Sequence, residues 1–358
     1  MYNIKMLTHI KQNKGIILWS MFVLGVFAFI QFRLDQYLQY SIDGQSLALR
    51  LQELLTLFLS IIAEAFPFVI LGTIISVIVA LFIKSEWILK YLPKNVILSN
   101  LIISLFGVFM PVCECGNVPV TRRLLSKNFT VSQSIVFLLA APIINPITLW
   151  STIEAFSPDT SIVIIRLIGA LVIANLAGFI ISFKKNQYEL LQDDFYNNYC
   201  KVNLDNHDHN HDQHSHHDHL HHHHNSKIEE AFEIFRTEFW EVTKLLCLGA
   251  FFAALSQIFI PRDVITSIGQ SPILSIVAMM LFAFVISICS NVDAFVALPY
   301  VSTFSLGSIM SFLLFGPMID MKILTMLKSS FKLKLIIFLV VFVGLSSFLA
   351  GLIINLLV

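Results

Sequence analysis

The sequence predicts an all-α polytopic membrane protein with two inverted repeats and one extra N-terminal helix. Each repeat is expected to contain three spanning helices and a re-entrant broken hairpin. Three observations predict this fold. First, 56% of the 358 residues are hydrophobic and 13% are charged, whereas soluble domains carry about 25% charged residues. Second, the apolar residues form long runs. Third, polar and glycine landmarks of the first half recur in the second.

The apolar runs are long enough to cross or enter a bilayer, since a spanning helix needs about 20 such residues. No small-residue cleavage site follows the first run, which therefore predicts a retained helix rather than a signal peptide. The runs, which leave room for seven to nine crossings, cover residues 15–32, 54–83, 96–112, 131–156, 161–183, 238–260, 272–289, 304–321 and 335–358.

Five landmarks of the first half recur in the same order in the second half, at offsets between 173 and 177 residues. Such ordered landmarks indicate an internal duplication. The pairs are Glu64 and Glu241, Gly72 and Gly249, Cys115 and Cys289, Pro142 and Pro317, and Gly178 and Gly351. The predicted parts are an N-terminal transmembrane helix and loop (1–49), a first membrane repeat (50–183), a His-rich cytoplasmic linker (184–227) and a second membrane repeat (228–358).

The distribution of Lys and Arg chooses between parallel and inverted repeats. If every segment crosses, the basic residues split evenly, eleven on each side, with Lys184 outside and both Lys322 and Lys332 inside. If the segments with "CGNV" and "CSNV" enter and return on one side, nineteen lie inside and three outside, with Arg166 left out of both counts. Basic residues gather in cytoplasmic loops. This pattern predicts re-entrant hairpins, inverted repeats, seven crossings and a cytoplasmic N-terminus.

Two cysteines, an acid and an amide interrupt the apolar sequence at "PVCECGNVPV", residues 111–120. In an extended hairpin tip, Cys113 and Cys115 face one side and Glu114 the other. Paired thiols suit thiophilic species such as Cu(I), Zn(II), Cd(II) or trivalent arsenic, although a buried cysteine can also be a small hydrophobic residue. We expect Cys113, Cys115 and Cys289 to line a substrate path, and Cys247 to serve packing.

Small and amide side chains follow the cysteines. Gly116 and Asn117, with their counterparts Ser290 and Asn291, fall in predicted hairpin turns, because Gly and Asn tolerate positive φ and close backbone approach. They either handle a passing ligand or only end the broken helices. The sequence leaves both interpretations open.

Acidic residues in apolar runs are costly and are usually functional or paired. Glu64 and Glu241 are repeat equivalents, which predicts proton coupling or cation pairing, or else a structural role as partner to Lys244 or to a helix terminus. Asp293 follows the second hairpin tip, and Asp320 aligns with Asn145 where prolines predict broken helices. We assign all five positions to the substrate path.

A histidine-rich segment, "HDHNHDQHSHHDHLHHHH", separates the repeats at residues 207–224. Imidazoles titrate near neutrality and bind Zn, Cu, Ni or Co. The segment predicts cytoplasmic metal buffering or sensing, or else a low-complexity linker that binds metal incidentally. Its candidate metal ligands are His207, His209, His211, His214, His216, His217, His219, His221, His222, His223 and His224.

Other function classes receive little support. The formal net charge is zero, which argues against nucleic acid as a partner. The sequence contains no GxxxxGK[ST] motif, so transport would be driven by a gradient or by a separate protein. A thiol redox enzyme is a weaker interpretation, because no cofactor site accompanies the thiols. We expect no enzymatic activity and no cofactor other than a metal ion such as Zn at the His-rich linker.

The segments "CECGNVPVTRRLL", "APIINPIT" and "CSNVDAF" resemble the predicted permease family that includes the ArsP-type organoarsenical efflux proteins and many uncharacterised relatives. The resemblance covers both repeats, but neither the first helix nor the linker. It implies a bacterial cytoplasmic-membrane permease and, for some members, export of trivalent organoarsenicals through cysteine ligation. The ligands here would be Cys113, Cys115 and Cys289. The His-rich linker points instead toward metal-ion homeostasis.

The sequence therefore predicts a secondary permease that moves a thiophilic metal or metalloid species outward, through a midplane site formed by the two hairpin tips. One alternative is a divalent, zinc-like metal-ion permease. Another is a membrane subunit or metal sensor of a multi-protein transport complex, with a membrane or metal-binding protein as partner. The substrate, the coupling ion and the oligomeric state stay open.

Overall fold

The computed structural model describes most of both predicted repeats. The first predicted helix (15–32) and the His-rich segment (207–224) lie outside the described residues. Those residues are 45–82, 92–93, 95–110, 113–157, 161–197, 227–259 and 272–357.

The chain divides into two compact units, Met1–Leu57 and Phe58–Val358. Helix α2 (Gln45–Phe82) begins in the first unit and ends in the second, so the predicted start of the first repeat at residue 50 falls inside a helix. The contacts and sites described below lie in the second unit.

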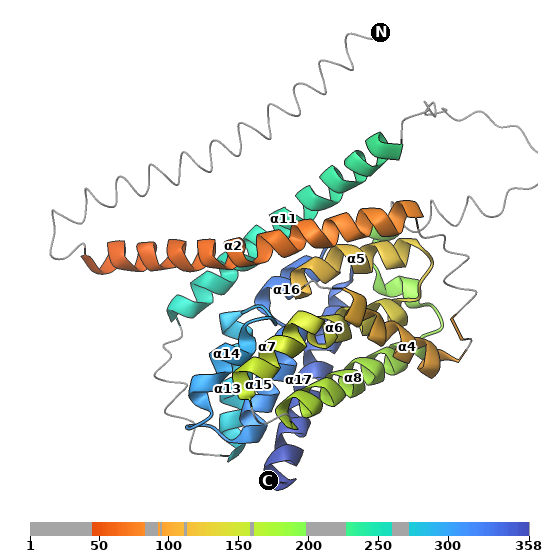
Figure 1. The fold of residues 1–358 in the computed structure, drawn as a ribbon. Helices are drawn as coiled ribbons and strands as arrows, with labels where there is room; N and C mark the ends of the chain where they lie inside the picture. The colour runs from red at the N-terminus through yellow and green to blue at the C-terminus, as the bar shows by residue number, and fades with distance from the viewer. Residues whose placement is uncertain are drawn as a thin grey trace, which may run out of the picture. The chain divides into compact units, whose positions relative to one another are not determined.

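The structure is helical throughout the described residues, apart from one isolated β-bridge between Leu191 and Phe331, which confirms the all-α class (Figure 1). After α2, the first half contains α4 (Val96–Leu105), η1 (Phe106–Phe109), α5 (Glu114–Ser126), α6 (Val131–Ile144), α7 (Pro146–Phe156), α8 (Ser161–Ser182), η2 (Gln187–Leu190) and α9 (Asp193–Phe195). The second half contains α11 (Lys227–Phe259), α13 (Pro272–Ile286), α14 (Asp293–Ala297), η4 (Leu298–Tyr300), α15 (Leu306–Met318), α16 (Met321–Leu327) and α17 (Leu333–Leu357).

Six segments of the described chain are long and apolar enough to span a membrane, three in each half. Two shorter apolar helical segments, Val96–Phe109 and Ile273–Ile286, occupy the places where re-entrant hairpins are predicted. The protein is therefore a multi-pass membrane protein, although the inverted relation of its halves stays a prediction. The spans are Leu51–Leu81, Val131–Phe156, Ser161–Ser182, Ala231–Gln257, Leu306–Leu327 and Leu333–Leu357.

Two of these helices carry matching stripes of exposed apolar side chains, which suit contact with lipid. Both stripes recur at every fourth position and so cover one helical face. Members of the second stripe follow those of the first by 173 residues, within the offset range of the predicted duplication. The stripe of α8 contains Ile164, Ile168, Val172, Leu176 and Ile180, and that of α17 contains Ile337, Val341, Leu345, Leu349 and Ile353.

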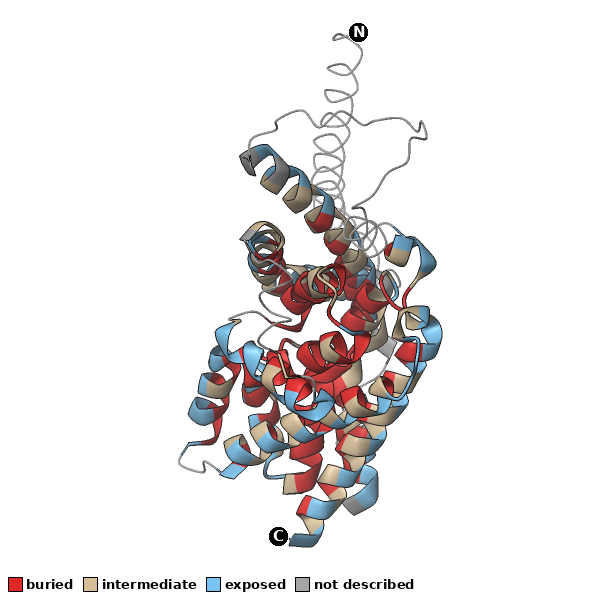
Figure 2. Cartoon of the chain, turned by 90° about the vertical axis from the view of Figure 1, so that its right-hand side faces the viewer, coloured by how far each residue is buried: buried red, intermediate tan, exposed pale blue. Residues whose placement is uncertain are grey.

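The core is built around α6 and α15, whose side chains are nearly all buried. The buried residues lie on the inward faces of the surrounding helices (Figure 2). Helix α8 packs closely on α6 at Gly178, where an added Cβ would overlap the Val136 side chain. Likewise α17 packs on α15 at Gly351, where a Cβ would overlap the Ser311 hydroxyl. These two glycines are repeat partners in the sequence.

Each core helix is interrupted and then continues as a second, shorter helix. The Asn145 side chain begins α7 by accepting the backbone N–H of Ile147 at 2.9 Å. The Asp320 carboxylate begins α16 in the same way, accepting the backbone N–H of Ile323 at 2.7 Å. Both side chains are therefore N-caps. Residues 145 and 320 align in the sequence, and in the structure both cap the N-terminus of the helix that follows the break.

The first part of the predicted linker is folded against the turn before α17. The Gln192 N–H donates to the Ser330 carbonyl at 2.9 Å, and the Lys332 N–H donates to the Leu190 carbonyl at 2.8 Å. The Gln187 side chain also accepts the Ser132 N–H at the start of α6, at 3.0 Å. These contacts bring the end of α8, the start of α6 and the start of α17 to one side, which favours the re-entrant arrangement over full crossing of every segment.

Candidate functional site

The first hairpin motif forms the start of a helix. The Cys113 carbonyl accepts the N–H groups of Gly116 at 3.1 Å and Asn117 at 3.2 Å, and α5 begins at Glu114. The prediction of an extended tip is therefore wrong, and Cys115 lies in the first helical turn. No described glycine has a positive φ. Gly116 instead lies where α2 approaches α5 closely, since a Cβ on Gly72 would overlap the Gly116 carbonyl oxygen.

The second motif keeps the predicted turn. Residues 290–292 form the turn, and α14 begins at Asp293. The Cys289 carbonyl accepts the N–H groups of Val292 at 3.0 Å and Asp293 at 3.1 Å. These bonds run three and four residues forward, as they do from Cys113. The backbone geometry thus matches Cys289 with Cys113, whereas the sequence pattern pairs it with Cys115.

The two motifs meet in a group that we name the thiol–carboxylate cluster, formed by Cys113, Glu114, Cys115, Cys289, Asp320 and Lys322. The sulfur atoms of Cys113 and Cys289 and a carboxylate oxygen of Glu114 lie within 4.8 Å of one another. The Cys113 thiol is also within hydrogen-bonding reach of Cys115. Every member is 2% exposed or less, so the cluster is closed to solvent and can hold a thiophilic ion by two sulfurs and one oxygen.

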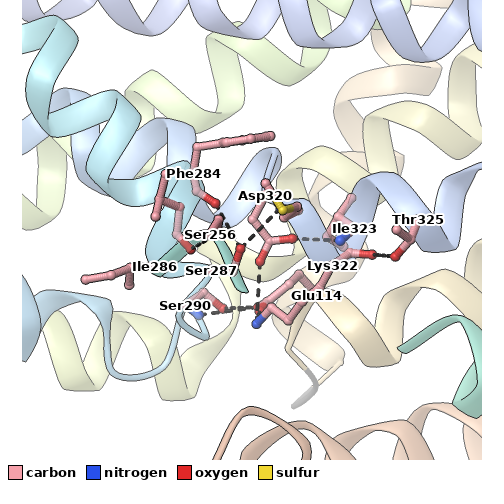
Figure 3. A network of polar contacts seen from close by, with 12 residues as sticks. Glu114, Ser256, Phe284, Ile286, Ser287, Ser290, Asp320, Lys322, Ile323 and Thr325 are labelled. Carbon is pink, nitrogen blue, oxygen red and sulfur yellow. Dashed lines mark hydrogen bonds and ion pairs between the residues drawn. The ribbon is translucent and has the colours of Figure 1, made fainter. Parts of the chain in front are cut away.

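Glu114 connects the two halves of the molecule at this cluster (Figure 3). Its Oε2 accepts the backbone N–H of Ser290 at 3.3 Å and the Ser290 hydroxyl at 3.2 Å. Its Oε1 lies 3.3 Å from the Lys322 Nζ atom. The Lys322 Nζ is also 3.4 Å from Asp320 Oδ2. One ammonium group thus lies between two carboxylates.

Lys322 lies in the first turn of α16, with its side chain 2% exposed. Lys322 is thus a buried helix residue rather than an exposed loop residue, so it gives no support to the charge count that predicts the topology. Its neighbour Met321 donates a backbone N–H to the Ser287 hydroxyl at 3.2 Å. Ser287 has a φ of 50°, a conformation that is uncommon outside glycine. This serine positions the start of α16 beside the second motif.

Two further predicted residues lie at the cluster. Glu64, on α2, lies near the backbone N–H of Cys289 and interacts electrostatically with Lys322, Glu114 and Asp320. Its Oε1 atom is buried and has no hydrogen-bond partner among the described residues.

Asn117 is fully buried in the first turns of α5. Within the described part of the chain, neither its Nδ2 nor its Oδ1 atom has a hydrogen-bond partner. A buried amide usually has partners. Its unsatisfied amide, in the helical turns that follow Cys113 and Cys115, makes Asn117 a candidate ligand contact.

The charge of the cluster region favours a cation. Glu64, Glu114 and Asp320 supply three carboxylates. Lys322 supplies one ammonium group, which contacts Glu114 and Asp320. Interactions between such charges are stronger in a buried site than in water. An arriving cation would therefore be attracted, and its charge would be offset by acids of both halves.

A second buried group, which we name the arginine cluster, lies around α8 and α14. The Arg166 guanidinium donates to Asp293 at 2.6 Å and to the Thr152 hydroxyl at 2.8 Å. The Thr148 hydroxyl donates to Asn291 Oδ1 at 2.9 Å. This cluster takes up the predicted site residues Asn291 and Asp293, so they do not join the thiols.

Glu241 also lies elsewhere. Its carboxylate accepts a 2.7 Å bond from Arg122, near the end of α5. Glu114 starts the same helix eight residues earlier, which corresponds to about 12 Å along its axis. The next residue, Arg123, pairs with Glu238 of the same helix α11. The basic pair of the motif thus ties α5 to α11, and Glu241 belongs to this contact.

Three charged residues of the two buried clusters are missing from the sequence-based set: Glu114, Lys322 and Arg166. For Arg166 the signal was a lone charge within the apolar helix "SIVIIRLIGALVIANLAGFIIS", which by itself suggests a functional position. For Lys322 the signal was its position next to the helix break at Asp320. Their partners lie 127 and 208 residues away, and no local pattern reveals such pairs.

Comparison with known proteins agrees with the membrane architecture. The ArsP_1 family, described as a predicted permease, matches residues 50–356. The UPF0718 protein YcgR of Bacillus subtilis is 39% identical over 291 residues, which cover 81% of this chain and 93% of that protein. A putative two-component membrane permease complex subunit of Streptococcus mutans is 37% identical over 293 residues, or 82% and 91%. No solved structure matches significantly. The chain therefore belongs to the ArsP_1 family of predicted permeases.

Proposed function

We propose that this permease exports a thiophilic metal or metalloid species and binds it at the thiol–carboxylate cluster. One observation carries the proposal: two thiols and a carboxylate from opposite halves come within 4.8 Å of one another in a closed site. Soft thiolate ligands select Cu(I), Zn(II) and similar species. Transporters commonly place such sites near the bilayer midplane, where broken helices of two repeats meet.

The surrounding helices support a transport role for this site. Helices α5 and α16 both begin at the cluster, at Glu114 and behind the Asp320 cap. Acidic groups at helix N-termini are stabilised by the helix dipole, and Lys322 contacts both carboxylates. A site of this kind can hold a cation and also release it.

The cell membrane is the proposed location, with a cytoplasmic N-terminus and a gradient as the driving force. Transport rather than catalysis is the proposed activity. The His-rich segment at 207–224 is proposed to buffer metal on the cytoplasmic side. Replacing its eleven histidines with asparagine should lower the zinc bound per chain and leave maximal flux unchanged. A large fall in maximal flux would instead make the segment part of the path.

Membership of a transport complex is the second candidate. The Streptococcus mutans relative is named as a subunit of a two-component membrane permease complex. If the same holds here, the purified chain alone will bind cargo and show no flux. Flux should then appear when the second component is added to the same vesicles.

Flux measurements on the purified full-length protein in vesicles would test the proposal. Zn(II) and methylarsenite would be supplied separately. We expect Cys113→Ser/Cys289→Ser to lower flux at least about tenfold, because loss of even the outer-shell partners of metal ligands costs about 10–100-fold in other sites. Cys247→Ser is the matched control, because Cys247 lies on α11 and outside the cluster. Wild-type flux in the double variant would overturn the site assignment.

A further inference from the structure

We propose that Lys322 is a tethered counter-ion, which occupies the cargo site when it is empty and is displaced when a cation binds. This inference rests on the proposed function and specifies its substrate class: the cargo carries positive charge. It also assigns Lys322 a role in setting affinity and release.

The geometry places the ammonium group and the candidate cargo on the same carboxylate. Lys322 Nζ lies 3.3 Å from Glu114 Oε1. A carboxylate oxygen of Glu114 also belongs to the group that includes the sulfurs of Cys113 and Cys289. The other oxygen, Oε2, is held by the backbone and hydroxyl of Ser290. These contacts restrain rotation of the Glu114 carboxylate, so it cannot bind Lys322 and a second cation independently.

A cation bound by the two sulfurs and Glu114 would repel the ammonium group at close range. Such repulsion is strong in a buried site, where solvent does not screen it. Asp320 provides the alternative partner, because its Oδ2 is already 3.4 Å from Lys322 Nζ. Binding would thus shift Lys322 from Glu114 toward Asp320. On release, the ammonium group would return to Glu114 and help to expel the cation.

A neutral metalloid would not use this exchange. Trivalent organoarsenicals bind thiols without adding positive charge, so Lys322 could stay on Glu114 while they pass. Lys322 would then have no effect on their apparent affinity. Charge at position 322 therefore separates the two cargo classes within one site.

Initial rates in vesicles with the full-length protein would give KM and maximal flux for Zn(II) and for methylarsenite. Lys322→Met removes the charge and keeps an unbranched side chain. We expect the KM for Zn(II) to fall about tenfold, equivalent to about 1.4 kcal/mol, and maximal flux to fall because release slows. Lys322→Arg keeps the charge and should stay near wild type. The KM for methylarsenite should not change.

The double variant Lys322→Met/Asp320→Asn separates competition from net charge, because it loses one positive and one negative charge. It also protects against misfolding of the single variant, since it leaves no additional uncompensated acid. If Lys322 competes for Glu114, the double variant will have a lower KM for Zn(II) than wild type. If overall charge alone sets affinity, its KM will equal the wild-type value, and the proposal fails.

The two proposals fail separately. Absence of flux for both cargoes in wild type would overturn the proposed function and this inference with it. Methylarsenite flux without Zn(II) flux would support the permease function and show that the cargo is not a cation. If Lys322→Met leaves the KM for Zn(II) unchanged, or changes the KM of both cargoes equally, the permease function stands and the counter-ion role of Lys322 is wrong.

Discussion

Buried charges are the most costly residues of this membrane protein. In both buried clusters, acidic and basic side chains form ion pairs. Arg166 is fully buried and pairs with Asp293 at 2.6 Å. An unpaired charge at that depth would be strongly unfavourable. Three polar atoms of this group, Arg166 Nε, Asp293 Oδ1 and Asn291 Nδ2, still lack hydrogen-bond partners among the described residues. Pairing therefore leaves part of its hydrogen-bonding capacity unused.

Arg166→Met should destabilise the protein by about 3–5 kcal/mol, because it leaves Asp293 charged and buried without its partner. Thermal unfolding of the purified protein in detergent would measure the loss. The double variant Arg166→Met/Asp293→Asn removes both charges and should recover most of the stability. Equal Tm values for Arg166→Met and wild type would contradict the importance of the pair.

Asn117→Leu should separate function from stability. The Asn117 amide is buried and makes no hydrogen bond within the described chain, so its removal costs no protein–protein hydrogen bond. We expect an unchanged or higher Tm, together with a fall in flux of about tenfold or more, the scale of a lost ligand-supporting contact. A matching fall in both Tm and flux would show that the amide has a structural role instead.

Single residues were predictable where their own chemistry is unusual in an apolar sequence. They were unpredictable where their role depends on a partner far away in the sequence. The cysteines were found because thiols are conspicuous in an apolar sequence. Asp293 and Asn291 were also found, but their partners Arg166 and Thr148 lie in the other half of the chain. The separation of Glu241 from Glu64 could not be foreseen either, since repeat-equivalent positions need not be neighbours in space.

Close helix packing at glycine is the main feature at the scale of elements. Helix α2 reaches α5 at Gly72, where an added Cβ would overlap the Gly116 carbonyl oxygen. This contact lies one residue after Cys115 and three before Pro119 of the same helix. The position of the thiol–carboxylate cluster therefore depends on a backbone-to-backbone contact.

Gly72→Ala should separate α2 from α5 and destabilise the protein by about 1–3 kcal/mol, as overpacking does. Gly344→Ala in α17 is the matched control, because its Cβ would meet Phe315 at an ordinary 3.7 Å. Both changes gain about the same helix propensity, roughly 1 kcal/mol. Thermal unfolding and Zn(II) flux should fall for the first variant only. A rise in Tm for both would show that α2 adjusts without cost.

Helices and their breaks were largely predictable, whereas the conformation of the first hairpin tip was not. The apolar runs identified the spans, and prolines with Asn145 and Asp320 identified the breaks. Gly116 and Asn117 allowed two interpretations, since small and amide residues occur both in turns and where helices approach closely. In the structure both lie in helix α5, and Gly116 packs against Gly72, which belongs to a helix over forty residues earlier in the chain.

At the scale of the whole molecule, the arrangement of segments about the membrane has a direct test. Lys185 and Lys328 are both exposed and lie in the neighbouring turns after α8 and before α17. In a Cys200→Ser background, Lys185→Cys and Lys328→Cys should both react with an impermeant maleimide from the cytoplasmic side alone. Full crossing of every segment would put the two labels on opposite sides. Labelling from opposite sides would therefore reject the re-entrant hairpins.

Duplication was readable in the sequence because landmarks of both halves kept their spacing, and the matching stripes of α8 and α17 agree with it. Charge pairing between the halves was not readable. The acid of the first motif, Glu114, pairs with a base of the second half, and the acid of the second, Asp293, pairs with a base of the first. Repeat symmetry predicts equivalent positions, whereas these pairs join non-equivalent ones.

This crossed pairing makes each half depend on the other for the partners of its buried charges. A first half produced alone would carry Glu114 and Arg166 in the bilayer without their partners Lys322 and Asp293. A second half produced alone would carry Lys322 and Asp293 without Glu114 and Arg166. A gene split within 198–226 should therefore yield two fragments that membrane proteases remove when either is produced alone. Produced together, they should accumulate, because each supplies the charges that make the other tolerable to lipid.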